Sequence, residues 1–292
     1  MLFNFINWTA SPVLFSIGSI EIRWYSLMFI IGFWLGYKIE EAIYKKEGIP
    51  MEWLDKLFMY VFIGTIVGAR LGHVFFYGWD YYSQHIGEIF KVWEGGLASH
   101  GGAIGIIIAI LILARYTMKV NPLFVFDRLV IPVALVGALI RIGNLFNHEI
   151  YGHETSLPWG FRFIQNLHRW QAGAEPVFSA PSHPTQIYEA IIYLCVFALL
   201  MWMYWRKNAQ LRQGLIFGVF LLGIFGTRIF IELIKNNQEM FEEGMFMNMG
   251  QILSIPFVAI AIGLIIRAYR RPLEQPFKYD VRLFQQSGQP KK

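Results

Sequence analysis

Seven apolar runs, each about 20 residues long, constrain what this chain can fold into more than any other feature of its sequence. They lie near residues 24–44, 56–77, 97–115, 123–146, 186–205, 214–235 and 249–268. A helix of that length crosses the hydrocarbon core of a bilayer. Only 15% of the residues are charged, against about 25% in a soluble domain. The sequence therefore predicts an all-α integral membrane protein with about seven transmembrane helices.

The connections between these runs are short, apart from residues 147–185. That stretch is polar and rich in proline, which indicates an extramembrane elaboration and not a separate domain. We expect one polytopic membrane domain over residues 1–271, with this elaboration at about 147–185. Residues 272–292 form a polar tail.

The distribution of basic residues predicts the orientation, because Lys and Arg accumulate in cytoplasmic connections. The first, third and fifth connections and the C-terminal tail are the basic ones, with Lys45, Lys46, Lys56, Arg115, Lys119, Arg206, Lys207, Arg212, Arg267, Arg270, Arg271, Lys278, Arg282, Lys291 and Lys292. The second and sixth connections hold only Lys91 and Lys235, among several acidic residues. This pattern predicts an N-terminus outside and a cytoplasmic C-terminus.

With this orientation, the unusual polar side chains of all seven spans gather in the outer half of the membrane, and the inner halves hold little besides Asp127 and Arg128. The side chains in the outer half are Tyr25, Arg70, His73, Ser99, His100, Arg141, Asn144, Asn147, Glu149, His183, Gln186, Tyr188, Glu189, Arg228, Glu232 and Gln251. Taken singly, each has a structural explanation: an arginine can extend to the interface, and Arg228 and Glu232 can pair along one helix face. If arginine side chains merely extended to the nearest interface, charged residues would be found at both faces of the membrane. Their concentration at one face therefore indicates a functional site.

The chemistry of these side chains favours a phospholipid head group. Arg70, Arg141 and Arg228 carry planar, permanently charged forks that match phosphate geometry. His100 can accept a proton near neutral pH. We expect no cofactor, since the sequence lacks a metal-protease helix motif and a phosphate-binding glycine loop. The net charge of +5 does not indicate a nucleic-acid partner, because the basic residues lie between apolar runs.

Three classes of membrane protein remain open on these residues. An enzyme that acts on lipids would use the arginines at a reacting phosphate, whereas a phospholipid transporter or flippase would use them to guide head groups. A transporter usually has internal repeats and polar groups at the midplane, and neither is visible here. A structural membrane subunit is the third class, and the cluster of polar groups in the outer half of the membrane counts against it.

Seven ordered motifs resemble those of the bacterial prolipoprotein diacylglyceryl transferases, over about residues 12–271. The sequence RIGNLFNHEIYG at residues 141–152 is similar to the central motif of that family. The other six are RWYSLM at 23–28, GARLG at 68–72, WEGGLASHGG at 93–102, HPTQIYE at 183–189, RIFIE at 228–232 and MGQILS at 249–254. Three positions depart from the family pattern: Ile140 replaces a glycine, Leu145 a phenylalanine and Ile224 a tyrosine.

The resemblance implies transfer of a diacylglyceryl group from phosphatidylglycerol to the lipobox cysteine of a preprolipoprotein, in the bacterial inner membrane. The products would be a thioether and glycerol phosphate. His100, Arg141 and Arg228 would be the catalytic residues, with the active site toward the periplasmic leaflet. The substrate-binding residues would be Tyr25, Arg70, Asn144, Asn147, Glu149, Gly152 and Glu232. Membrane lipids would be the further partners.

Overall fold

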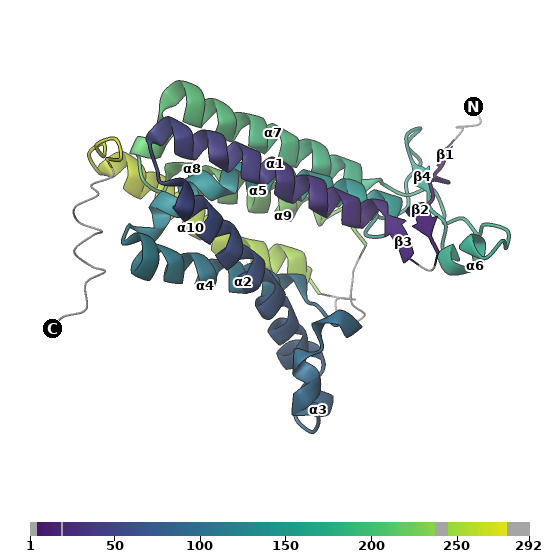
Figure 1. Cartoon of the computed structure of the whole chain (residues 1–292). Helices are drawn as coiled ribbons and strands as arrows, with labels where there is room; N and C mark the ends of the chain where they lie inside the picture. The colour runs from purple at the N-terminus through teal and green to yellow at the C-terminus, as the bar shows by residue number, and fades with distance from the viewer. Residues whose placement is uncertain (1–4, 19, 237–244, 279–292) are drawn as a thin grey trace. The chain divides into compact units, whose positions relative to one another are not determined.

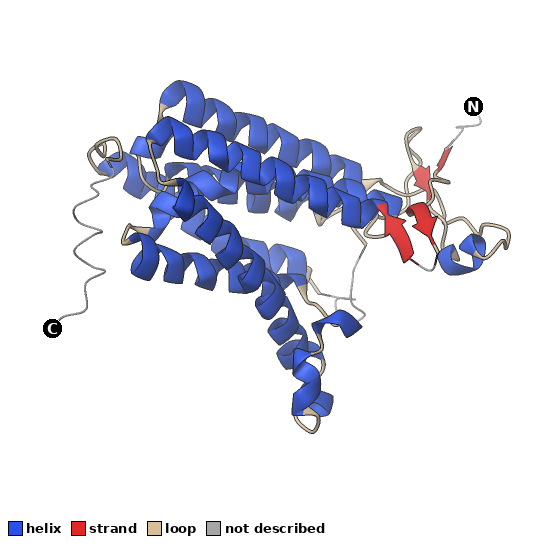
Figure 2. Ribbon diagram, in the orientation of Figure 1, coloured by secondary structure: helices blue, strands red, loops and turns tan. Residues whose placement is uncertain are grey.

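The computed structural model describes residues 5–18, 20–236 and 245–278. Most of the predicted tail, residues 279–292, and the acidic Glu239, Glu242 and Glu243 lie outside the described residues. In the described part of the chain, helices dominate the fold, and two small two-stranded sheets accompany them (Figure 2). The described residues form two compact units, one within residues 1–38 and 127–273 and one within residues 39–126 and 274–292.

All seven predicted spans are largely helical in the structure. They correspond to α1 (Trp24–Glu47), α2 (Met51–Tyr77), α4 (Ser99–Ile112) with its π-helical continuation η3 (Leu113–Met118), α5 (Pro122–Phe146), α7 (Thr185–Lys207), α8 (Leu215–Leu221) with η5 (Leu222–Gly226) and α9 (Thr227–Ile231), and α10 (Met249–Arg270). Among the described residues, five helices are long and apolar enough to cross a membrane: α2, His100–Met118, α5, α7 and α10. The helix Leu215–Ile231 is apolar but shorter. Exposed large apolar side chains, such as Ile30 and Trp34 on α1, agree with a surface that faces lipid.

In the first unit, glycines let the helices approach closely. A side chain at Gly218 of α8 would meet Ile265 of α10 at 2.9 Å. The start of α8 is fixed by a buried carboxylate, because Asp127 of α5 accepts hydrogen bonds from the backbone N–H groups of Gly214 (2.6 Å) and Phe217 (2.9 Å). Asp127 thus provides the free N–H groups at the start of a helix with an anionic acceptor.

The turn η5 interrupts the helix between α8 and α9. Its residues follow π-helical geometry, which places one more residue in the turn than an α-helix does. The hydroxyl of Thr227 donates to the Gly223 carbonyl (2.5 Å) and also lies 3.2 Å from the Ile224 carbonyl. The next residue along α9 is Arg228.

The predicted elaboration lies at one end of the helices of this unit (Figure 1). It contains α6 (Leu167–Gln171) and β4 (Phe161–Arg162), which pairs in parallel with β1 (Ile6–Asn7). The second sheet pairs β2 (Val13–Ile17) with β3 (Ile20–Arg23) in antiparallel fashion, directly before α1. A small core of Leu145, Phe161 and Phe163, with Trp8 and Tyr151 packed against it, attaches the elaboration to the end of α5.

His148 is a structural residue of this elaboration. Its Nε2 lies 2.9 Å from the Ala10 carbonyl, and its Nδ1 accepts a hydrogen bond from the Ile164 N–H at 3.1 Å. Burial lowers the pKa of His148 below its usual range, against the opposing effect of the bond to Ala10. A neutral imidazole with one donor and one acceptor therefore joins three segments that are far apart in the sequence.

The second unit is organised by the close packing of α2 on α4. Side chains added at Gly68 or Gly101 would overlap backbone atoms of the opposite helix, so the two backbones are in direct contact. The unit also contains α3 (Trp79–Tyr82), the short helices η1 (Ile86–Phe90) and η2 (Val92–Glu94), and an apolar cavity of about 640 Å³ on the α2–α4 pair. The contact of small residues here has the pattern that membrane helices use to associate.

Candidate active site

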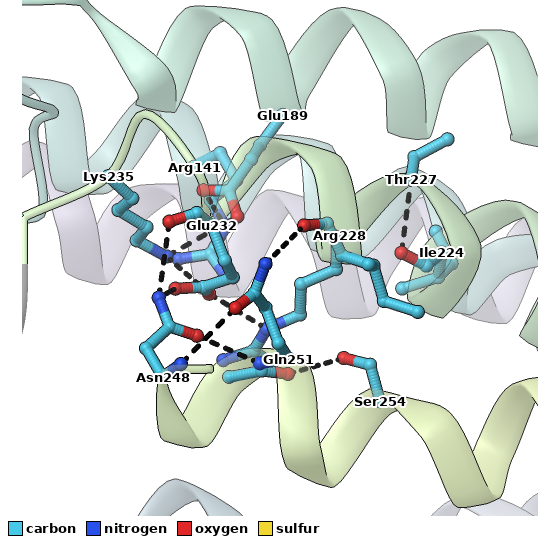
Figure 3. Close-up of polar contacts among 12 residues, drawn as sticks. Arg141, Glu189, Ile224, Thr227, Arg228, Glu232, Lys235, Asn248, Gln251 and Ser254 are labelled. Atoms are coloured by element: carbon cyan, nitrogen blue, oxygen red, sulfur yellow. Dashed lines mark hydrogen bonds and ion pairs between the residues drawn. The ribbon is translucent and has the colours of Figure 1, made fainter. Parts of the chain in front are cut away.

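A cluster of charged residues lies in the first unit where four helices come together. Arg141 is on α5, Glu189 on α7, Arg228 on α9, and Glu232 and Lys235 follow directly after α9. Figure 3 shows these side chains turned toward one another, with the start of α10 below them. Glu189, Glu232 and Lys235 are almost fully buried, whereas the side chains of Arg141 and Arg228 are 17% and 30% exposed. The two arginines are therefore the cations that a ligand can reach.

Arg141 is held by a carboxylate from another helix. Its Nε lies 3.0 Å from Glu189 Oε2, an ion pair in which the N–H is not aligned for a hydrogen bond. The guanidinium also lies over the ring of Tyr193 on α7, 6.0 Å from its centroid. A side chain at Gly137 of α5 would meet that ring at 2.9 Å, so the glycine makes room for it. These contacts fix Arg141 between α5 and α7.

Arg228 is held by a carboxylate four residues later in the chain. Its Nε donates to Glu232 Oε1 at 3.0 Å. Within the part of the chain that the structure describes, no hydrogen bond engages its two terminal nitrogens. Arg228 therefore presents the forked end of a guanidinium, which matches a phosphate group.

The start of α10 supports Glu232. Asn248 and Gln251 form a capping box, in which each side chain accepts a hydrogen bond from the backbone N–H of the other. The Asn248 amide also donates to Glu232 Oε2 (3.2 Å), and the Gln251 amide donates to the Ile229 carbonyl (3.1 Å). Gly250 lies directly against the Glu232 carboxyl group, where a Cβ atom would overlap it. The helix cap thus fixes both the backbone after Arg228 and the carboxylate that holds it.

Lys235 connects the two carboxylates. Its Nζ lies 3.5 Å from Glu189 Oε1 and 3.4 Å from Glu232 Oε1, and the side chain is 1% exposed. The cluster thus alternates cation and anion from Arg141 through Glu189, Lys235 and Glu232 to Arg228. Each buried charge has an opposite charge beside it, which a low-dielectric site requires.

A second chain of contacts leads from Arg141 to the segment after α5. Arg141 Nη1 donates to Asn144 Oδ1 (3.3 Å), and the amide groups of Asn144 and Asn147 donate to Glu149 Oε1 at 2.8 and 3.1 Å. Tyr25 of α1 packs on Gly143 of α5, 2.8 Å from where a Cβ would stand. The structure therefore brings together most of the predicted site residues of the first unit.

The segment after Asn147 is strained and held in place. Ile150 has a φ of 63°, a left-handed conformation that β-branched residues rarely adopt and that costs about 1–3 kcal/mol. The Thr185 hydroxyl donates to the Ile150 carbonyl (2.9 Å), and the Gln186 amide donates to the Glu149 carbonyl (2.7 Å). A side chain at Gly152 would overlap the Ile234 carbonyl. Gly152 thus allows this segment to pack against the chain just before Lys235.

Two predicted site residues lie in the second unit. Arg70 is buried, and it donates to the carbonyls of Ile89 (2.8 Å), Gly95 (2.7 Å), Gly96 (3.4 Å) and Glu88 (2.5 Å). Its guanidinium is therefore occupied by backbone groups. His100 is exposed at the start of α4. Among the described residues, its ring contacts are with Phe76 and Tyr77, at centroid distances of 5.2 and 5.6 Å.

The matched pairs of arginine and carboxylate favour an anionic ligand over a metal ion. Within residues 5–18, 20–236 and 245–278, no group of three His, Cys, Asp or Glu side chains could hold a metal. Arg228 offers an open fork beside a second, partly exposed arginine, and backbone and side-chain contacts hold both. Such an arrangement can bind a phosphate and stabilise negative charge that develops on it.

The family model of prolipoprotein diacylglyceryl transferase matches residues 12–267. A phosphatidylglycerol–prolipoprotein diacylglyceryl transferase of Porphyromonas gingivalis is 51% identical over 277 residues, which cover 93% of this chain and 97% of that protein. Proteins with the same name from Tolumonas auensis and Chloroherpeton thalassium are 44% and 39% identical, over 89% and 92% of this chain and 96% of each relative. The chain belongs to the prolipoprotein diacylglyceryl transferase family. The resemblance inferred from the sequence motifs is thereby confirmed.

The sequence prediction assigns no specific role to three members of the cluster in this transferase-family chain. Glu189 and Gln251 belong to the polar group that the sequence places in the outer half of the membrane, and Lys235 enters the sequence argument only as an orientation charge. Lys235 follows Glu232 by three residues, a spacing that places both on one helix face, so this local signal was available. The pairing of Glu189 with Arg141 joins different helices and leaves no such signal.

The position of Gly250 generates a testable prediction. Replacement by alanine places a Cβ atom against the Glu232 carboxyl group, whose Oε1 and Oε2 would be 2.6 and 2.7 Å away. We expect Gly250→Ala to lower the free energy of unfolding in detergent by about 1–3 kcal/mol. Gly263→Ala on the same helix is the control, since a Cβ there meets nothing within 4 Å. Equal stability of the two variants would contradict the close packing at Glu232.

Proposed function

We propose that this chain transfers the diacylglyceryl group of phosphatidylglycerol to the lipobox cysteine thiol of a preprolipoprotein, the first step of lipoprotein maturation. The relatives that match it along most of its length carry the name of this transferase. The observation that carries the proposal is the open guanidinium fork of Arg228 beside Arg141, with both arginines paired to carboxylates through Nε. This arrangement would form a phosphate-binding site among apolar helices of the length that crosses a membrane.

In the proposed reaction, the cysteine sulfur attacks the glyceryl carbon that bears the phosphate. A carbon–sulfur bond forms, the carbon–oxygen bond to phosphate breaks, and its electron pair leaves with glycerol phosphate. Arg141 and Arg228 bind the head group and stabilise the charge that grows on the departing phosphate. Preorganised cations in a site of low dielectric commonly provide several kcal/mol of such stabilisation.

We propose His100 as the group that accepts the thiol proton. A free thiol has a pKa of about 8.5, so the reactive thiolate needs a base or a cationic neighbourhood near pH 7. The exposed imidazole of His100 has no hydrogen bond to another described residue, and it is therefore available to a substrate. Its approach to the arginine cluster stays a prediction, because His100 belongs to the second unit.

The remaining predicted residues receive more specific proposed roles. The head-group site would be lined by Asn144, Asn147 and Glu149, which would also position Arg141. Tyr25 would close this site at Gly143. Gly152 would allow the segment after α5 to adopt its path. Glu232 would orient Arg228. For Arg70 we propose a structural role, fastening the segment from Glu88 to Gly96, because its guanidinium already donates to backbone carbonyls there.

We propose a multi-pass protein of the bacterial inner membrane with seven spans, an N-terminus outside and a cytoplasmic C-terminus. Both units, over residues 1–271, would form one membrane domain, with residues 147–185 in the periplasm and the tail 272–292 in the cytoplasm. The site would face the periplasmic leaflet. In support, the cluster in the first unit lies at the helix ends that the distribution of basic residues assigns to the outside.

A phospholipid transporter or flippase is the alternative function. It would use the same arginines to guide head groups and would release the lipid unchanged. The transferase names of the relatives do not favour it. Mass spectrometry of a lipobox peptide after incubation with purified protein and phosphatidylglycerol separates the two, since only the transferase adds the diacylglyceryl mass.

The arginine cluster generates the first prediction on activity. Arg228→Lys keeps the charge but loses the fork, so we expect transfer to the lipobox peptide to fall by about 100-fold. Arg141→Lys should behave alike. The control is Arg206→Lys, an exposed arginine in the last turn of α7, which should transfer at the wild-type rate. Near-normal turnover of Arg228→Lys would show that Arg228 serves only as a structural ion-pair partner of Glu232.

The proposed base generates a second prediction. His100→Gln should keep its affinity for phosphatidylglycerol while the transfer rate falls. The loss should shrink from about pH 7 to about pH 9, because more of the thiol ionises without help. Rates of both proteins across this range measure the effect. A loss that stays constant with pH would remove His100 from the role of base.

The proposed orientation is tested by thiol labelling of intact cells. In a Cys195→Ser background, which removes the one native cysteine, single cysteines at Gln171 and Glu88 should react with an impermeant maleimide. Cysteines at Lys46 and Lys207 should react only after the membrane is opened. The reverse pattern would place the site on the cytoplasmic side.

A further inference from the structure

Lys235 is the least exposed charged residue in the cluster, and the proposed mechanism gives it no task. We propose that Lys235 is a positioning residue that prevents Glu189 from forming a two-pronged ion pair with Arg141. It would thereby keep open for the lipid phosphate a terminal nitrogen of Arg141 that such a pair would occupy. The inference rests on the proposed function, since it assigns a role in the binding of that head group.

The two oxygens of the Glu189 carboxylate have different partners. Oε2 lies 3.0 Å from Arg141 Nε, and Oε1 lies 3.5 Å from Lys235 Nζ on the other side. A two-pronged pair would require both oxygens to face the same guanidinium. While Lys235 attracts Oε1, Glu189 can neutralise Arg141 through a single contact only.

The Glu232 carboxylate is held differently, because Arg228 and Lys235 share one oxygen and Asn248 engages the other. Its Oε1 is shared between Arg228 Nε at 3.0 Å and Lys235 Nζ at 3.4 Å. Its Oε2 accepts a hydrogen bond from the Asn248 amide at 3.2 Å. Both oxygens are thus engaged away from the terminal nitrogens of Arg228.

A lysine suits this task because of its shape. An ammonium group is a compact charge with three donors and no fixed plane, so it can attract two carboxylates at once. Its position, with only 1% of the side chain exposed, keeps it out of reach of the ligand. Without it, the buried Glu189 carboxylate would have only Arg141 to pair with, and an uncompensated buried charge is costly. Glu189 would then turn both oxygens to Arg141 and compete with the phosphate.

The test compares Lys235→Met with Lys235→Met/Glu189→Gln. The single variant should raise the KM for phosphatidylglycerol and weaken equilibrium binding of phosphatidylglycerol micelles, measured without peptide, by about 10-fold, the equivalent of one lost charge-assisted contact. The KM for the lipobox peptide should change less than twofold. The double variant should regain most of the lipid affinity, because a neutral amide cannot hold Arg141 as a carboxylate does.

Two controls isolate the positioning role. Lys235→Arg retains the charge and should keep lipid affinity within a few-fold of wild type, and Lys207→Met removes an exposed lysine and should have no effect. The unfolding temperature of every variant is measured in parallel. If Lys235→Met does not purify as a folded protein, the double variant carries the test, and it should still bind the lipid.

Three outcomes would overturn the proposal. They are unchanged lipid affinity in Lys235→Met, equal losses for lipid and peptide, and no recovery on adding Glu189→Gln. Failure of the proposed function gives a different result: wild-type protein would bind phosphatidylglycerol micelles without modifying the peptide. The binding comparison among the variants would then still decide the role of Lys235.

Discussion

The fold of the first unit depends on one constraint: buried charges must be paired where water cannot reach them. Glu189, Glu232 and Lys235 are almost entirely buried, and they come from α7 and from the segment after α9. Each of the three stays charged there because an opposite charge lies beside it. Lys235 lies between the two carboxylates, and Arg141 and Arg228 pair with Glu189 and Glu232. The ion pairs therefore fix the relative positions of α5, α7 and α9, and the cap of α10 adds the fourth helix through Asn248.

Small residues and local strain serve the same network. Gly250 brings α10 against Glu232, Gly137 admits the ring of Tyr193, and Gly152 lets the segment after α5 reach the chain before Lys235. The left-handed Ile150 costs energy, which its hydrogen-bonded neighbours Thr185 and Gln186 offset. Strained backbone next to charged residues is common where the geometry of a site matters more than its stability.

Much of this could be predicted from sequence, because it depends on spacing along one helix. The apolar runs predicted the helices, and the interval from Arg228 to Glu232 predicted a pair that the structure contains. Contacts between helices could not be predicted in this way, because they depend on how each helix is rotated against its neighbour. The pairing of Glu189 with Arg141 is one such contact. Strands of two to five residues, such as β1 and β2, carry too little periodicity to be recognised.

The π-helical turn η5 has a consequence for the side-chain directions of the helix that contains it. One additional residue advances the direction of every later side chain by about 100°. The helix from Leu215 to Ile231 can therefore direct an apolar face toward α10 at Gly218 and still direct Arg228 and Glu232 into the polar interior. A continuous α-helix would have a single helical phase, and the apolar residues that pack on α10 and the charged residues of the site would have to lie along one stripe. The extra residue lets one helical segment present these two sets of side chains in different directions.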